Sequence, residues 1–129
     1  MRAYFWGNMY LSSIQQGIQS AHCLAEIYEG VREHHHEPVK HMKDWAQNHK
    51  TMILLNGGYS ENLHRLVTFM SREQNTYPWG CFHEGEDALD GALTCVGIVL
   101  PGVIYNGAAC IRRNSLAEVE MGKFNDERN

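Results

Sequence analysis

Four polar side chains follow one side of a stretch that is spaced like a helix, over about residues 13–30. They are Gln15, Gln19, His22 and Glu26, which are separated by four, three and four residues. Residues at these spacings share one helical face. Solvated faces usually mix lysine with glutamate, whereas this one holds two amides, a histidine and one carboxylate. It is either a boundary face satisfied by neighbouring loops or the wall of a ligand site.

An apolar line runs beside the polar one and predicts the face that packs on the core. Its members, three or four residues apart, are Ile14, Ile18, Ala21, Ala25 and Tyr28. Ser13, with Gln16 three residues on, predicts the N-cap and its capping box. Gly17 costs about 1 kcal/mol relative to alanine inside a helix, which indicates close approach by another element or a ligand.

Two predicted strand-to-helix junctions carry the residue types of an anion site. One is GNMYLSS (residues 7–13) and the other is NGGYS (residues 56–60). Helix N-termini offer free N–H groups and a partial positive charge to anions. The candidate binding residues are Asn8, Ser12, Ser13, Asn56, Gly57, Gly58 and Ser60. Because Asn-Gly-Gly is also a common tight turn, the sequence leaves both interpretations open.

Histidines occur in two further places that could carry chemistry. HEGED (residues 83–87) is either an acidic surface turn or a source of acid/base and hydroxyl-binding groups, with His83 and Glu84 as the candidates. The run at residues 34–36, with His41 nearby, invites a metal interpretation. Three consecutive histidines point in different directions, however, and no Cys or acidic partner lies at structural-zinc spacing. We therefore expect a solvated loop, with no metal and no cofactor.

The elements that must position these residues alternate between strands and helices. Strands are predicted at residues 3–10, 51–56, 79–83 and 92–100. Helices are predicted at residues 13–30, at 41–49 with Trp45 as anchor, and after a cap at Ser60. This order predicts an α/β fold, a small mixed β-sheet of about four strands sandwiched by helices. The residues expected in its core include Tyr4, Ile53, Leu55, Val96 and Ile98.

Composition bounds the class of protein. The 129 residues predict a single α/β domain over residues 1–112 and a polar C-terminal tail over residues 113–129. Four scattered cysteines without a C-x-x-C pair are expected to be buried thiols. Mean hydropathy is −0.42 and no apolar run of about 18 residues occurs. We expect no membrane association, and the N-terminus lacks a signal-peptide pattern, so the expected location is cytoplasmic.

Charge argues against a nucleic-acid partner. The net charge is −4, from 11 Lys+Arg and 15 Asp+Glu, and only Arg112 and Arg113 are adjacent basic residues. Proteins that bind duplexes or tRNA usually present a basic surface, because phosphate contacts supply most of their affinity. The sequence shows no sign of such a patch.

Taken together, these residues resemble the archaeal/eukaryotic-type peptidyl-tRNA hydrolases. In that family the first strand leads to a helix with a Gly-Lys-x-Ala-Ala-Gln-x-x-His-Ala pattern, which Gln19 and His22 match. Trp45 ahead of the second strand also fits, and Thr94 in LTCVGIVLP takes the threonine position of the family's last strand. The resemblance covers about residues 3–101. It implies a peptidyl-tRNA hydrolase II-like fold, a homodimer and a shared pocket.

The departures from the family fall on its chemistry. The family's lysine maps to Gln15, and its Asp-Ala-Gly-Arg-Thr segment maps near residues 82–86, where the acids remain but the pattern is lost. The sequence therefore predicts a non-enzymatic protein that binds or sequesters a small nucleotide or similar anionic metabolite. A phage protein that sequesters an immune nucleotide signal is one such use. The alternatives are a peptidyl-tRNA hydrolase with rearranged catalytic residues, the only case with tRNA as partner, and an interaction module without a ligand.

Overall fold

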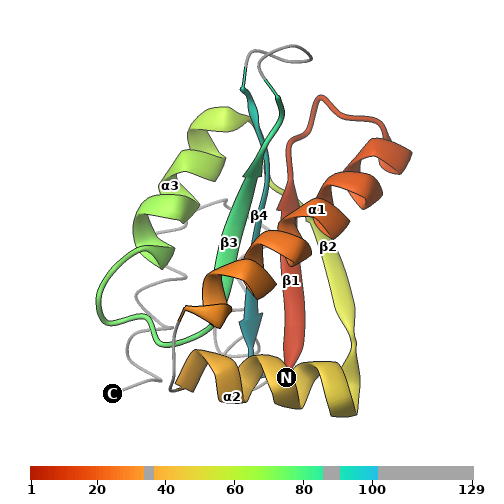
Figure 1. Ribbon diagram of the computed structural model, residues 1–129. Coiled ribbons are helices and arrows are strands. Elements are labelled where there is room, and N and C mark those ends of the chain that lie inside the picture. Colours follow the sequence, from red (N-terminus) through yellow and green to blue (C-terminus); the bar gives the residue numbers. More distant parts are fainter. Residues whose placement is uncertain (34–36, 86–90, 102–129) are drawn as a thin grey trace.

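Four strands form one mixed sheet in the order β2-β1-β4-β3 (Figure 1). The structure is a computed structural model that describes residues 1–33, 37–85 and 91–101. Its strands are β1 (Arg2–Gly7), β2 (Met52–Asn56), β3 (Trp79–His83) and β4 (Leu93–Leu100). β2 is parallel to β1, and β4 is antiparallel to both β1 and β3. The carboxyl ends of β1, β2 and β3 therefore lie at one edge of the sheet.

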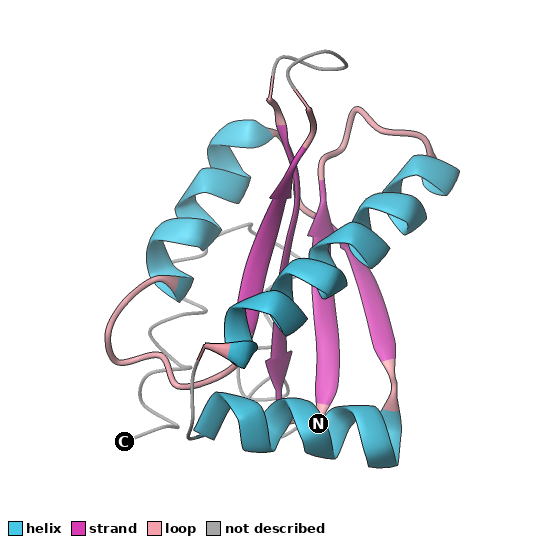
Figure 2. Ribbon diagram, in the orientation of Figure 1, coloured by secondary structure: helices cyan, strands magenta, loops and turns pink. Residues whose placement is uncertain are grey.

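Helices cover both faces of this sheet (Figure 2). α1 (Ser13–Arg32) and α2 (Glu37–Asp44), which runs on into the π-helical turn η1 (Trp45–His49), pack on one face. α3 (Ser60–Met70) packs on the other. The predicted α/β class, with a mixed four-stranded sheet between helices, is confirmed. Trp45 is buried as predicted, and its indole Nε1–H donates to the carbonyl of Thr51 at 2.9 Å.

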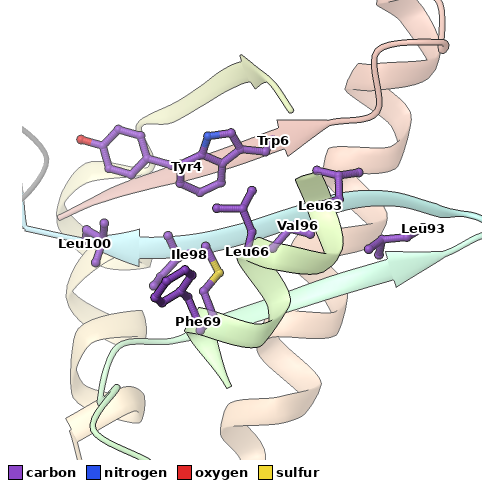
Figure 3. Packing of buried hydrophobic residues seen from close by; sticks show 10 residues of the cluster. Tyr4, Trp6, Leu63, Leu66, Phe69, Leu93, Val96, Ile98 and Leu100 are labelled. Atoms are coloured by element: carbon purple, nitrogen blue, oxygen red, sulfur yellow. The ribbon is translucent and has the colours of Figure 1, made fainter. Parts of the chain in front are cut away.

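Side chains of β1 alternate between two cores, as the pleat of a strand requires. Tyr4 and Trp6 point toward α3 and pack with its residues Leu63, Leu66 and Phe69 (Figure 3). Ala3 and Phe5 pack on the α1 side. Val96 and Ile98 of the central strand β4 are buried as expected. Ile53 and Leu55 are only half-buried, because β2 is an edge strand with a neighbour on one side.

Two glycines that face each other across β3 and β4 let α1 lie close to the sheet. Gly80 and Gly97 are register partners. A Cβ on Gly97 would lie 2.7 Å from the Phe5 ring and 3.2 Å from the Cys23 sulfur, and one on Gly80 would lie 3.2 Å from the backbone nitrogen of Ile27. The Cys23 thiol in turn donates to the Gly80 carbonyl at 3.4 Å. Any side chain at these positions would push α1 off the sheet.

The structure corrects the predicted orientation of α1. The apolar line expected in the core faces solvent: Ile14 is 78 % exposed, Ile18 49 % and Tyr28 39 %. The buried face consists of Gln19, Ser20, Cys23, Ile27 and Val31. α1 therefore carries two apolar lines, and periodicity alone cannot distinguish them. The prediction chose one line, whereas the structure packs Cys23 and Ile27 of the other over the two glycines.

Several boundaries also differ from prediction. Ser12, not Ser13, is the N-cap of α1, and its capping box uses Gln15 rather than Gln16. β1 ends at Gly7 instead of continuing to residue 10, because the chain turns away after it. α3 begins at Ser60, but its N-cap is Tyr59, which provides no side-chain cap. A Cβ on Gly17 would meet no protein atom within 4 Å, so the predicted close approach by another element is wrong, and close approach by a ligand stays a prediction.

The described cysteines fit the prediction of buried thiols in two cases out of three. Cys23 and Cys95 are buried free thiols, and Cys81 is half-buried. A hydrogen bond with Cys95, together with burial, raises the pKa of the Cys23 thiol. Cys110, the domain boundary at residue 112, the polar tail and the histidines at 34–36 lie outside the described residues. Within the part of the chain that the structure describes, no helix is long and apolar enough to cross a membrane.

The orientation of α1 can be tested with two identical substitutions on one helix. Ile27 is fully buried against Gly80, whereas Ile18 is 49 % exposed. We expect Ile27→Ala to lower the free energy of unfolding by about 2–5 kcal/mol. Ile18→Ala should change it by no more than about 0.5 kcal/mol, as is usual for surface sites. Urea unfolding followed by circular dichroism measures both, and the reverse ranking would contradict this orientation.

Candidate functional site

The candidate site lies at the edge where β1, β2 and β3 end, at the top of Figure 1. Hydrogen bonds tie the loops of this edge together. The Met9 N–H donates to the Gly58 carbonyl at 2.7 Å, and the Gly57 N–H donates to the Gly7 carbonyl at 2.8 Å. The Asn8 N–H donates to the Thr94 carbonyl at 2.9 Å. The structure thus brings the residues predicted from both strand-to-helix junctions to one place.

Asn8 and Thr94 lie beneath this edge and hold its parts in position. The Asn8 side chain is 1 % exposed. Its Nδ2 donates to the Ser60 hydroxyl at 3.2 Å and to the Leu93 carbonyl at 3.0 Å. Thr94 is fully buried, and its hydroxyl donates to the Phe82 carbonyl at 3.2 Å. Both side chains are occupied by bonds within the protein, so they position the site rather than line it.

The N-terminus of α1 is capped from within. The Ser12 hydroxyl accepts from the Gln15 N–H at 3.2 Å, and the Gln15 Oε1 accepts from the Ser12 N–H at 3.1 Å. These predicted ligand groups therefore serve the helix in this structure. Ser13 is exposed, and the first turn contains no acidic residue. Its N–H groups give the turn the partial positive charge of a helix N-terminus.

The Asn-Gly-Gly segment forms a tight turn. The Asn56 Oδ1 accepts from the Gly58 N–H at 2.8 Å, and Gly58 has a positive φ of 70° that favours glycine. A Cβ on Gly57 would lie 2.6 Å from Leu63 and 2.8 Å from the Gly7 carbonyl oxygen. Both glycines are therefore explained by backbone geometry. Binding of an anion at this loop stays a prediction, and the exposed Glu61 in the first turn of α3 opposes it.

Three of the predicted residues form a hydrogen-bonded chain beside this edge. The Gln19 Nε2 donates to the Glu84 Oε2 at 2.7 Å, and the His22 Nδ1 lies 3.1 Å from the Gln19 Oε1. Because the Gln19 amide gives its donor to the carboxylate, its oxygen is the acceptor for a hydrogen on His22 Nδ1. The Phe82 ring lies against the imidazole, with centroids 4.6 Å apart. His22 therefore presents Nε2, with its lone pair, on an exposed side chain.

His83 lies at the end of β3 in a similar state. Its Nδ1 lies 3.0 Å from the carbonyl oxygen of Gly91. A carbonyl oxygen only accepts, so Nδ1 carries the hydrogen. The other ring nitrogen, Nε2, is then open to a ligand. The ring of His64, from α3, lies 6.4 Å from it between centroids. The edge thus bears three histidines from three different elements.

Two exposed tyrosines border the same edge and were missed by the sequence analysis. Tyr10 is 49 % exposed in the loop after β1, and Tyr59 is 63 % exposed in the loop after β2. Each directly follows one partner of the backbone hydrogen bond between Met9 and Gly58, so they come from two loops that are joined beside them. Tyr10 was assigned to a strand and Tyr59 was overlooked. A large aromatic side chain in a loop before a helix cap was the available signal.

Comparison with known protein families and with curated proteins finds no match to this chain.

In the described residues, no group of three or more His, Cys, Asp or Glu side chains could hold a metal ion. His41 lies on α2, away from this edge, where it pairs with Glu37 at 3.4 Å and packs against the ring of Tyr77. Burial lowers the pKa of its imidazole.

The chain from Glu84 to His22 predicts an unusual histidine tautomer. Neutral histidine in water prefers the hydrogen on Nε2, whereas the Gln19 Oε1 requires it on Nδ1. We expect Gln19→Met to move the hydrogen to Nε2, as seen in two-bond nitrogen–proton NMR spectra at mildly alkaline pH. Gln15→Met, the same change one turn earlier, should leave His22 unaltered. An Nε2–H tautomer in the unsubstituted protein would contradict the chain.

Proposed function

We propose that this protein binds a small nucleotide, or a similar anionic metabolite with an aromatic ring, without turning it over. The observation that carries the proposal is the pair of exposed tyrosines, Tyr10 and Tyr59, on two loops joined by a backbone hydrogen bond at the carboxyl edge of three strands. Ligands of open α/β sheets favour this edge. Exposed aromatic rings are where bases stack, with about 1–3 kcal/mol per base.

Polar groups of matching chemistry lie along the same edge. The Nε2 atoms of His22 and His83 can accept from a base or a hydroxyl, or donate to an anion once protonated. The half-buried Glu84 can accept from ribose hydroxyls with its second oxygen. The first turn of α1 offers N–H groups without a competing carboxylate. These groups support a ligand that combines a ring, hydroxyls and a limited negative charge.

The proposal includes the use and the assembly of the protein. The small size of the chain and its net charge of −4 favour a free nucleotide over a polynucleotide, whose phosphates need many cations. Sequestration of a signalling nucleotide, such as an immune signal bound by a phage protein, is a use that requires affinity alone. A homodimer rests on the resemblance to the peptidyl-tRNA hydrolase fold.

The tyrosines provide the test. We expect Tyr59→Ala to weaken nucleotide binding by about 1–3 kcal/mol, the value of a stacked base, while Tyr59→Phe keeps the ring and the affinity. The measurement is isothermal titration calorimetry with mononucleotides and cyclic dinucleotides, guided by native mass spectrometry of the protein as purified. Tyr28→Ala is the matched control, because Tyr28 is also exposed but lies in the C-terminal half of α1, beside α2. Equal binding by Tyr59→Ala and the unsubstituted protein would exclude the proposed stacking.

Hydrolysis of an ester such as peptidyl-tRNA is the second candidate, and one observation favours it. His22 is oriented through Gln19 by Glu84, in the manner of a general base whose Nε2 takes a proton from an attacking water. The resemblance places Gln19 and His22 in the matching family positions. The scarcity of cations weighs against it, which is why this function comes second.

A hydrolysis assay separates the two candidates. With peptidyl-tRNA as substrate, the hydrolase hypothesis expects release of free tRNA and a loss of about 100-fold or more with His22→Asn, as for removal of a general base. The binding hypothesis expects no release by either protein. Gln16→Ala, also on α1 and bonded only to the Leu11 carbonyl through its side chain, controls for general damage to the helix.

A further inference from the structure

A groove on the opposite side of the fold from the candidate site has the character of a second binding site. It lies between the C-terminal half of α1 and the α2–η1 segment, and α2 crosses the end of the sheet opposite the candidate edge (Figure 1). Its volume is about 550 Å³. Small-molecule sites commonly measure about 300–1,000 Å³ and combine apolar walls with a few polar groups.

The walls of this groove are largely aliphatic, with Tyr28 of α1, 39 % exposed, as the aromatic side chain among them and Gln47 of η1 as a neutral polar one. Val31 of α1 and Met42 of α2 are buried at 7 % and 2 % exposure, and Val39 is 38 % exposed. Ala46 of η1 adds a small side chain. Valine and alanine offer aliphatic surface beside the Tyr28 ring, and methionine adapts to flexible apolar ligands. The aliphatic part of these walls suits a hydrocarbon chain.

The charged residues that line the groove are both cations. Arg32 comes from α1 and Lys43 from α2, so they belong to opposite walls. The Arg32 guanidinium contacts the Glu29 carboxylate at 3.0 Å, but both side chains are largely exposed. An exposed pair of this kind contributes little, so an incoming anion can replace Glu29 at small cost. The groove therefore combines aliphatic walls with positive charge at its rim.

We propose that this groove binds a free acyl chain with a carboxylate head, a fatty acid, with its chain along Val31, Val39 and Met42 and its head between Arg32 and Lys43. The proposal is independent of nucleotide binding, because the groove shares no lining residue with the candidate site. It also gives the 38 % exposed Val39 an apolar partner.

The test compares three ligands with the same chain below their micelle concentrations: dodecanoate, dodecanol and dodecyltrimethylammonium. Calorimetric titration of the intact protein should give the highest affinity for dodecanoate and at least tenfold weaker binding of the other two. Arg32→Gln combined with Lys43→Gln should weaken dodecanoate at least tenfold and leave dodecanol unchanged. Arg65→Gln, which removes an exposed cation of α3, is the matched control and should change neither.

Val39→Glu provides a second route to the same conclusion, since it places an anion at the rim and changes only an exposed position. It should abolish dodecanoate binding and leave the unfolding transition and the response to Tyr59→Ala unchanged. Equal affinity for dodecanoate and the ammonium ligand, or undiminished binding in the double variant, would overturn the proposal. So would a dimer in sedimentation that Val39→Glu dissociates, because a second copy would then occupy the groove, or binding to phosphatidylcholine vesicles in place of the free acid.

Discussion

The contact between α1 and the Gly80–Gly97 pair is the constraint on which the rest of this structure depends. With no Cβ on either strand at this point, the backbone of α1 at Ile27 comes close to Gly80 of β3, and the Cys23 sulfur comes close to Gly97 of β4. Cys23 and Ile27 are the α1 residues that lie over these glycines. Close packing of this kind tolerates little change in volume. The rotation of α1 about its own axis is thereby set.

That rotation has consequences on both sides of the helix. On the flank toward the end of β3 it brings Gln19 to Glu84 and His22 to the ring of Phe82. On the outer side it leaves Ile14 and Ile18 in solvent. Exposed apolar residues arranged in a line are more informative than isolated ones. The orientation of α1 therefore determines both which polar side chains meet and which apolar side chains are exposed.

The polar residues at the carboxyl edge of the sheet fall into two groups. The first group, Asn8, Thr94 and Asn56, forms side-chain hydrogen bonds with the loops and strands of the edge. These internal hydrogen bonds avoid the cost of unpaired buried groups. The groups left to meet a ligand are those on the outside, the two tyrosine rings and the imidazoles of His22 and His83. The proposed function rests on these groups, which the hydrogen bonds of the fold leave available.

Local patterns were sufficient to predict most elements. The apolar runs predicted all four strands, the caps predicted both long helices to within a few residues, and Trp45 was correctly expected as an anchor. They also predicted that Gln19, His22 and Glu84 have suitable chemistry. These features depend on neighbours a few residues away, and the sequence alone determines them. Half-burial of Ile53 and Leu55 was not predictable, because position at the edge of a sheet is a property of strand order.

Only the tertiary structure decided which side of α1 faces the sheet. Two apolar lines of helical period exist in its sequence, and a hydrophobic pattern gives no reason to prefer the one that contains Ser20 and Cys23. The contacts that decide it come from Gly80 and Gly97, more than fifty residues further along the chain, over which Ile27 and Cys23 pack. The bond from Gln19 to Glu84 spans 65 residues for the same cause. The sequence determined which groups this protein possesses, and close packing across the sheet decided which of them meet.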